Sequence, residues 1–131
     1  MAFGARMYLI ENDGKGIPRA TSLPDVAWGS LQEALGMESA GDMGMMYAAE
    51  ASGKEPVGMM MVTCEPGGVI ATHTGPQTFM CYLVQGRGKL TLQGGEPLDY
   101  QPGDLFVFKP ETLHGWENGE ETTVVLVVAV S

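Results

Sequence analysis

The sequence predicts an all-β protein, built as an antiparallel barrel or jelly roll with one short helix near its N-terminus. Nineteen glycines and eight prolines divide the 131 residues into short segments, a punctuation typical of sandwiches and barrels. The runs between these breaks are rich in Val, Met, Thr, Phe and Tyr and have the length of strands. No helical pattern separates them, which favours antiparallel over parallel sheets.

A chain of 131 residues is expected to form one domain with one hydrophobic core. We assign residues 57–131 to the barrel core and residues 1–56 to N-terminal strands, a short helix and a loop. The apolar runs predict strands at 57–65, 78–84, 89–92, 104–108 and 122–130, with further candidate strands at 6–10 and 45–50.

The helix is expected over residues 26–35, where apolar side chains recur on one helical face. Ser22 or Asp25 is a suitable N-cap, and Gly36 provides a stop. Residues 37–44 are small, polar and interrupted by glycine, so we expect a loop there that covers one mouth of the barrel.

Charge and composition limit the class of partner. Sixteen acidic residues against seven basic ones give a net charge of −9, and the basic residues form no stripe, so neither nucleic acid nor an acidic membrane is an expected partner. The chain has no signal-peptide pattern at its start and no apolar run long enough to span a bilayer. We therefore expect a cytoplasmic protein whose ligand is a small molecule.

Two cysteines, Cys64 and Cys81, fall within expected strands, and neither has a CxxC partner. Zinc-knuckle and thioredoxin-type sites therefore have no support. We interpret both as reduced, buried thiols, with a disulfide possible if their strands are neighbours.

The most informative motif lies near the C-terminal end. Gly103 and Asp104 form a turn, Pro110 precedes a loop, and His114 and Asn118 follow at a fixed spacing. This pattern resembles the second conserved motif of the cupin superfamily, with Glu111 at the position of a usual glycine. The resemblance covers roughly residues 60–130. It implies a closed antiparallel barrel with a small-molecule site around His73 and His114, the only histidines of the chain.

The first cupin motif is degenerate and can be placed in two registers. If Gly67 and Gly86 frame it, His73 is the first ligand histidine, Gly75 replaces the second, and Phe79 replaces the family's glutamate.

In the other register, His73 is the second ligand histidine, Ala71 replaces the first and Gln77 replaces the glutamate. Strand side chains alternate with a period of two, so both registers point His73 to the same, inward face.

The resemblance implies a divalent transition metal (Fe, Mn, Ni or Zn) held by His73, His114 and Gln77, with Cys81 as a further possible donor. A catalytic metal site commonly needs three protein ligands. The leading prediction is therefore a metal-dependent enzyme of oxygenase, isomerase or lyase type, acting on a small and fairly apolar organic molecule.

Two alternatives stay open at this point. The histidines could serve as the acid and base of a metal-free isomerase, cyclase or lyase. The barrel could also bind a small ligand without catalysis.

Strand parity adds three candidate pocket residues, Phe79, Cys81 and Trp116. The run from Met80 to Val84 is apolar at every position, which indicates a strand covered on both faces and hence a homodimer. The resemblance also implies dimers in which an N-terminal strand, such as residues 7–10, joins the sheet of the partner.

Overall fold

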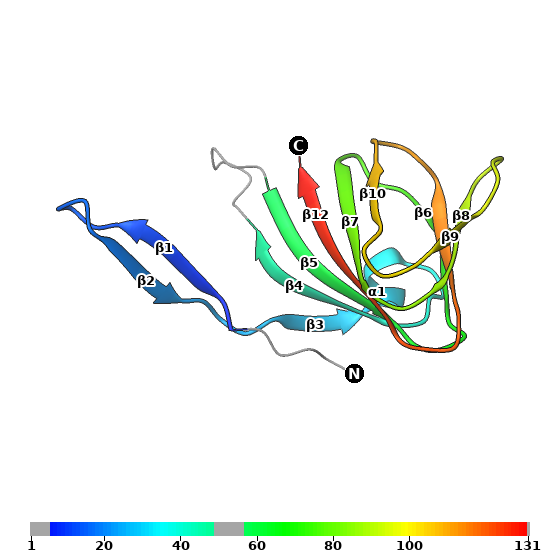
Figure 1. Cartoon of the computed structure of the whole chain (residues 1–131), viewed down its shortest axis with the longest axis horizontal. Helices are drawn as coiled ribbons and strands as arrows, with labels where there is room; N and C mark the ends of the chain where they lie inside the picture. The colour runs from blue at the N-terminus through cyan, green and yellow to red at the C-terminus, as the bar shows by residue number, and fades with distance from the viewer. Residues whose placement is uncertain (1–5, 49–56, 131) are drawn as a thin grey trace.

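The computed structural model describes residues 6–48 and 57–130. Within these ranges the chain forms antiparallel strands and one short helix (Figure 1). The elements in order are β1 (Tyr8–Asn12), β2 (Pro18–Ser22), β3 (Ala27–Ser30), α1 (Leu31–Leu35), β4 (Asp42–Ala48), β5 (Val57–Cys64), β6 (Val69–His73), β7 (Thr78–Gln85), β8 (Gly88–Leu92), β9 (Leu98–Tyr100), β10 (Leu105–Phe108), β11 (His114–Asn118) and β12 (Thr123–Val130).

Two sheets face each other and enclose the core. The larger has the strand order β10-β7-β12-β5-β4-β3 and the smaller has the order β6-β11-β8-β9. All their strand pairs are antiparallel. The hairpin β1–β2 forms a separate two-stranded sheet that stands away from this body (Figure 1). The prediction of an all-β antiparallel fold with a short helix is thus confirmed.

Alternation along the strands separates an inner face from an outer one. Leu83 of β7 and Val125 of β12 are paired neighbours that point inward and are almost fully buried. Leu90 of β8 and Trp116 of β11 face them from the smaller sheet within the same hydrophobic core. This two-layer packing leaves a cavity between the sheets.

The helix is shorter than predicted. Residues 27–30 form β3 instead, because Ala27 pairs with Met45 and Ser30 with Asp42 on β4. The predicted caps Ser22 and Asp25 were therefore wrong: the N-cap is Ser30, whose Oγ accepts a hydrogen bond from the backbone N–H of Glu33. The stop at Gly36 is confirmed, since this residue has the left-handed φ of 70° that favours glycine.

The apolar runs located the long strands within one or two residues. The strand predicted at 45–50 begins earlier, at Asp42, so that the predicted loop 37–44 is shortened; residues 49 and 50 lie outside the described residues. Strands β2, β6, β9 and β11 were not among the predicted runs because they are short and carry Pro, Gly or polar residues.

Both cysteines are free and buried, as predicted. Their strands β5 and β7 are not neighbours, since β12 lies between them and pairs Cys64 with Thr123 and Cys81 with Val127. Two strand spacings amount to about 10 Å, beyond the reach of a disulfide. No helix within residues 6–48 and 57–130 is long and apolar enough to cross a membrane.

Candidate functional site

The space between the two sheets is a cavity of about 240 Å³. Its wall comes from both sheets and from α1, and most of it is aliphatic or aromatic. Of the described residues that line it, none is an aspartate, glutamate, lysine or arginine. The aliphatic and aromatic part of the wall includes Leu31, Ala34, Leu35, Met43, Met60, Val62, Ile70, Phe79, Trp116, Val125 and Val127.

Two histidines lie side by side in this wall. His73 ends β6, His114 begins β11, and the register places them directly opposite each other. Their ring centroids are 4.5 Å apart. Each ring is oriented by a backbone carbonyl two residues earlier in the chain. Nδ1 of His73 lies 2.7 Å from the carbonyl oxygen of Ala71 on β6, and Nδ1 of His114 lies 3.1 Å from that of Thr112, in the loop before β11.

These two hydrogen bonds fix the tautomer of the neutral pair. A carbonyl oxygen only accepts, so each Nδ1 carries a hydrogen and donates it. The lone pair of each neutral imidazole is then on Nε2. The site therefore offers two neighbouring imidazoles, each with an unprotonated Nε2 that can act as a base or as a ligand.

His114 is the more enclosed of the two, with 5% of its surface exposed. Its ring stacks on Phe108 with centroids 3.9 Å apart, and Trp116 meets it edge-on. Burial lowers the pKa of His114 below its ordinary value, and the neighbouring His73 lowers it further, against the hydrogen bond to Thr112. His114 is thus held as a neutral imidazole near pH 7.

In the register framed by Gly67 and Gly86, the two departures from the first cupin motif, Gly75 and Phe79, are in contact. The ring of Phe79 lies over Gly75, and a Cβ added at Gly75 would be 2.5 Å from Phe79 Cε2. Real Cβ atoms do not approach carbon this closely, so a larger residue at 75 requires Phe79 to move. The Phe79 ring therefore occupies space that is open only because residue 75 is glycine.

A second polar cluster in the wall is already satisfied internally. The hydroxyls of Tyr100 and Thr123 both donate to Oδ1 of Asn118, so neither has a hydrogen left for a molecule in the cavity. The two hydrogens on Nδ2 of Asn118 are shared among the carbonyl oxygens of Cys64, Glu65 and Glu121, all within hydrogen-bond distance. Asn118 therefore ties three chain segments together and supports the wall.

In the metal-free protein both cysteines of the wall are protonated thiols, because burial raises the pKa of Cys81 to about 12 and that of Cys64 to about 11. Among the residues that the structure describes, no three His, Cys, Asp or Glu side chains are grouped so that they could hold a metal ion. The wall supplies two imidazoles, one donor short of a typical catalytic site, and so does not by itself fit a resident metal.

The family model of the cupin domain matches residues 60–130, more than half of the chain. The chain belongs to the cupin family. No curated protein is significantly similar to it in sequence.

Solved structures share the fold of this cupin at low sequence identity. The DMSP lyase DddQ from Ruegeria pomeroyi has a TM-score of 0.68 and 13% identity, over 81% of this chain and 56% of that one. The polyketide cyclase RemF from Streptomyces resistomycificus has a TM-score of 0.59 and 18% identity, over 71% and 72%. The cupin domain of Schizosaccharomyces pombe Cnp3 has a TM-score of 0.68 and 10% identity, over 98% and 89%. The chain spans little more than half the length of the lyase, and these likenesses establish the fold alone.

The structure brings five of the six predicted site residues of the cupin together. The cavity wall contains His73, His114, Phe79, Cys81 and Trp116, so the inward orientation inferred from strand parity is correct. Gln77 lies in the turn between β6 and β7 and is not among the described residues that line the cavity. Its predicted role as a metal ligand stays a prediction.

Sequence reasoning missed most of the wall, including Leu31, Tyr100 and Thr123, and also Phe108, on which the ring of His114 stacks. Alternation along residues 104–108 leaves two possible faces for Phe108, and only its pairing with Phe79 across β7 and β10 in the structure places it inward. Leu31 could not have been found, since its position depends on where α1 begins.

Proposed function

We propose that this cupin is a metal-independent enzyme in which the pair His73–His114 performs acid–base chemistry on a small, uncharged organic molecule. One observation carries the proposal. Two imidazoles with Nε2 lone pairs meet in an apolar cavity. In the register framed by Gly67 and Gly86, the positions of the further motif ligands are taken by Gly75 and Phe79, which are in contact.

The pair is suited to carry one proton at a time. With ring centroids 4.5 Å apart, two positive charges would repel each other in a poorly solvated site. One neutral imidazole accepts a proton from an activated C–H of the substrate at Nε2, and the electron pair of that bond moves into the substrate. The resulting imidazolium then returns the proton to another atom of the same molecule, as in an isomerisation, or to a leaving group.

The wall defines the class of substrate. An uncharged lining disfavours carboxylates, phosphates and amines, because burying their charge without a partner is costly. A cavity of 150 Å³ lined by apolar residues holds benzene, so about 240 Å³ suits a molecule of roughly ten non-hydrogen atoms. A ketone or another carbonyl compound with one acidic C–H satisfies both conditions.

The similar folds support this class of chemistry without specifying a reaction. Their names describe a DMSP lyase and a polyketide cyclase. At 13% and 18% identity, they support only the capacity of this barrel to enclose a small organic substrate.

The test is exchange of substrate hydrogen with solvent deuterium. Acetophenone and 2-indanone are incubated with the protein in D₂O, and deuterium at the α-carbon is followed by NMR. We expect exchange above the buffer rate that falls at least tenfold in both His114→Asn and His73→Gln. Glu117→Gln, an exposed change on β11, serves as the matched control and should retain the full rate.

Metal content is measured on the same wild-type preparation. Near-stoichiometric Fe, Mn, Ni or Zn that disappears in His114→Asn would overturn the metal-free assignment in favour of the metal-dependent enzyme. Wild-type exchange no faster than buffer, with both ketones bound, would overturn catalysis and leave a ligand-binding barrel. Exchange unaffected by either histidine change would overturn the role of the pair.

A further inference from the structure

Phe108 contacts the imidazole of His114 but is not among the described residues that line the cavity. The two rings are stacked, with centroids 3.9 Å apart and planes inclined by only 12°. Phe108 is the last residue of β10 and is 6% exposed. Any effect of Phe108 on a molecule in the cavity therefore passes through the ring of His114.

The direction of the Nε2 lone pair of His114 depends on the plane of its ring, because the lone pair of a neutral imidazole nitrogen lies in that plane. The hydrogen bond from Nδ1 to the carbonyl oxygen of Thr112 holds one side of the ring. A single hydrogen bond leaves the ring able to tilt about the line that joins its two atoms. A second contact is needed to fix the plane, and the stack on Phe108 supplies it.

Among the described ring contacts of His114, only the one with Phe108 is nearly parallel. The rings of His73 and Trp116 are inclined to the imidazole by 56° and 83°, with centroids 4.5 Å and 6.3 Å away. A tilted or edge-on neighbour touches the imidazole at a few atoms, whereas a stacked ring covers its face. Phe108 therefore restrains the plane of the imidazole more than its other neighbours do.

Phe108 is itself firmly held. Its strand pairs with β7, where Phe79 lies opposite it. Its ring contacts those of Phe106 and Trp116 at centroid distances of 6.3 Å and 6.1 Å. Buried side chains in a packed cluster of this kind keep a defined rotamer, so Phe108 offers the imidazole a rigid flat surface.

We propose that Phe108 is a positioning residue, whose face holds the imidazole of His114 in the plane from which Nε2 meets the substrate proton. This inference rests on the acid–base function proposed above. A misplacement of about 1 Å in a reacting group can cost about 100-fold in rate. Because Phe108 does not line the cavity, loss of its ring should lower kcat and leave KM nearly unchanged.

The test compares two phenylalanines of β10 in the deuterium exchange of acetophenone. Phe108→Leu removes the ring that stacks on His114, and Phe108→Met repeats the loss with another unstacked side chain. We expect both to lower kcat about tenfold and to change KM by less than about twofold. Phe108→Tyr keeps a flat ring and should restore most of kcat.

Phe106→Leu is the matched control. Phe106 belongs to the same strand and to the same aromatic cluster, since its ring meets that of Trp116 edge-on. It has no ring contact with His114 in the described structure and does not line the cavity. Its replacement removes the same ring from the core and should leave kcat and KM at their wild-type values.

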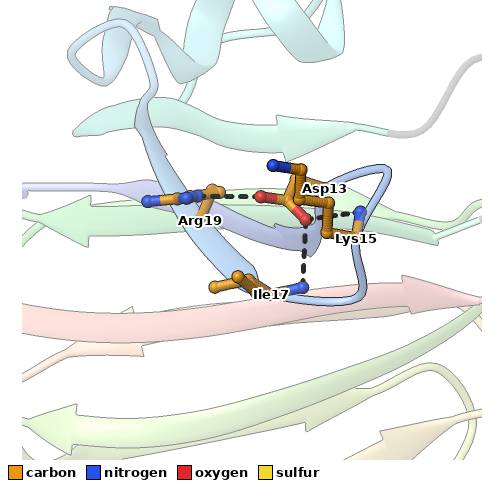
Figure 2. A network of polar contacts seen from close by, with 4 residues as sticks. All are labelled: Asp13, Lys15, Ile17 and Arg19. Atoms are coloured by element: carbon orange, nitrogen blue, oxygen red, sulfur yellow. Dashed lines mark hydrogen bonds and ion pairs between the residues drawn. The ribbon is translucent and has the colours of Figure 1, made fainter.

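A second control lies outside the core, at the turn of the hairpin β1–β2 (Figure 2). Oδ1 of Asp13 accepts hydrogen bonds from the backbone N–H groups of Lys15 and Ile17. Its Oδ2 accepts one from Arg19 Nε at 3.0 Å. Asp13→Ala removes these contacts in a hairpin that stands away from the cavity (Figure 1), and kcat should not change.

The order of the His114 ring is measured without substrate, by ¹³C relaxation of its Cε1–H bond. We expect a high order parameter in the wild type and in Phe106→Leu, and a lower one in Phe108→Leu. A ring that stays equally ordered in Phe108→Leu, or a raised KM with kcat unchanged, would overturn the positioning role alone. A wild type without exchange would instead overturn the acid–base function, and the order parameter would still decide whether Phe108 holds the ring.

Discussion

The ring of Phe79 occupies the space that any side chain at Gly75 would need, with Cε2 2.5 Å from the position of a Cβ. In one register of the first cupin motif, these are the positions of the second histidine and of the glutamate. The two departures are therefore one structural change, in which an aromatic ring replaces a carboxylate and a glycine makes room for it.

Restoring both positions should create a metal site. The double variant Gly75→His/Phe79→Glu adds an imidazole and a carboxylate beside His73 and His114, which completes a set of four donors. We expect near-stoichiometric binding of Zn²⁺ or Mn²⁺ by isothermal titration calorimetry, against weak binding by the wild type.

The single change Gly75→His is the control for this prediction. It forces Phe79 aside and should lower the free energy of unfolding by about 1–3 kcal/mol, the usual cost of overpacking. A double variant that gains no metal, or a single variant as stable as the wild type, would contradict the coupling of the two positions.

Acid should destabilise the protein partly through His114. Its pKa is lowered in the folded state, chiefly by burial, so the unfolded chain binds more protons at pH values near and below the ordinary pKa of about 6.5. The stabilisation is complete above that pH and is lost as the pH falls through the folded pKa.

Urea unfolding between pH 7.5 and 5 measures this loss. One histidine contributes at most about 1.4 kcal/mol per pH unit, and His114→Asn should reduce the slope of stability against pH by part of that amount. Parallel slopes in the two proteins would show that His114 does not titrate differently on folding.

Replacing Asn118 should lower the free energy of unfolding more than it affects the reaction in the cavity. Asn118→Ala removes the donor to three carbonyls and the acceptor of two hydroxyls. Unsatisfied buried groups cost about 1–3 kcal/mol each, so we expect a loss of roughly 2–4 kcal/mol in chemical denaturation. The neighbouring exposed change Glu117→Ala should alter stability by less than about 0.5 kcal/mol, and an equal loss in both would be evidence against the network.

Glu111 offers a stabilising substitution. It is the one non-glycine residue of the described chain with a positive φ, at 65°, and it stands where cupins usually have glycine. A left-handed backbone conformation costs a residue other than glycine about 1–2 kcal/mol. Glycine removes this cost, but part of the gain is lost because glycine has more conformational freedom in the unfolded chain.

Glu111→Gly should therefore raise the free energy of unfolding by about 0.5–1 kcal/mol. Glu111→Ala removes the same side-chain charge but keeps the strain, and it should give no such gain. Equal stability of the two variants would show that the charge, and not the backbone conformation, matters at this position.

The fold could be predicted from sequence because strands such as β5, β7 and β12 are continuous apolar runs bounded by turns. The start of the helix could not be predicted, because residues 27–30 form a strand only through pairing with β4. The local sequence pattern carries no information about that pairing. Parity placed His73 inward without fixing the register of the first motif, and His114 was placed by the resemblance to the second motif. The contact between Gly75 and Phe79 and the hydrogen bonds of Asn118 join residues through space, and no spacing rule indicates them.

Strand β12 also determines when the protein can fold during synthesis. One half of the larger sheet, β3-β4-β5, and the other half, β7-β10, are hydrogen-bonded to each other only through β12. A nascent chain therefore holds two unconnected sheet fragments until residue 130 has left the ribosome. The larger sheet closes only when β12 pairs with both fragments, and the uncharged strands β5 and β7 are open to aggregation until then.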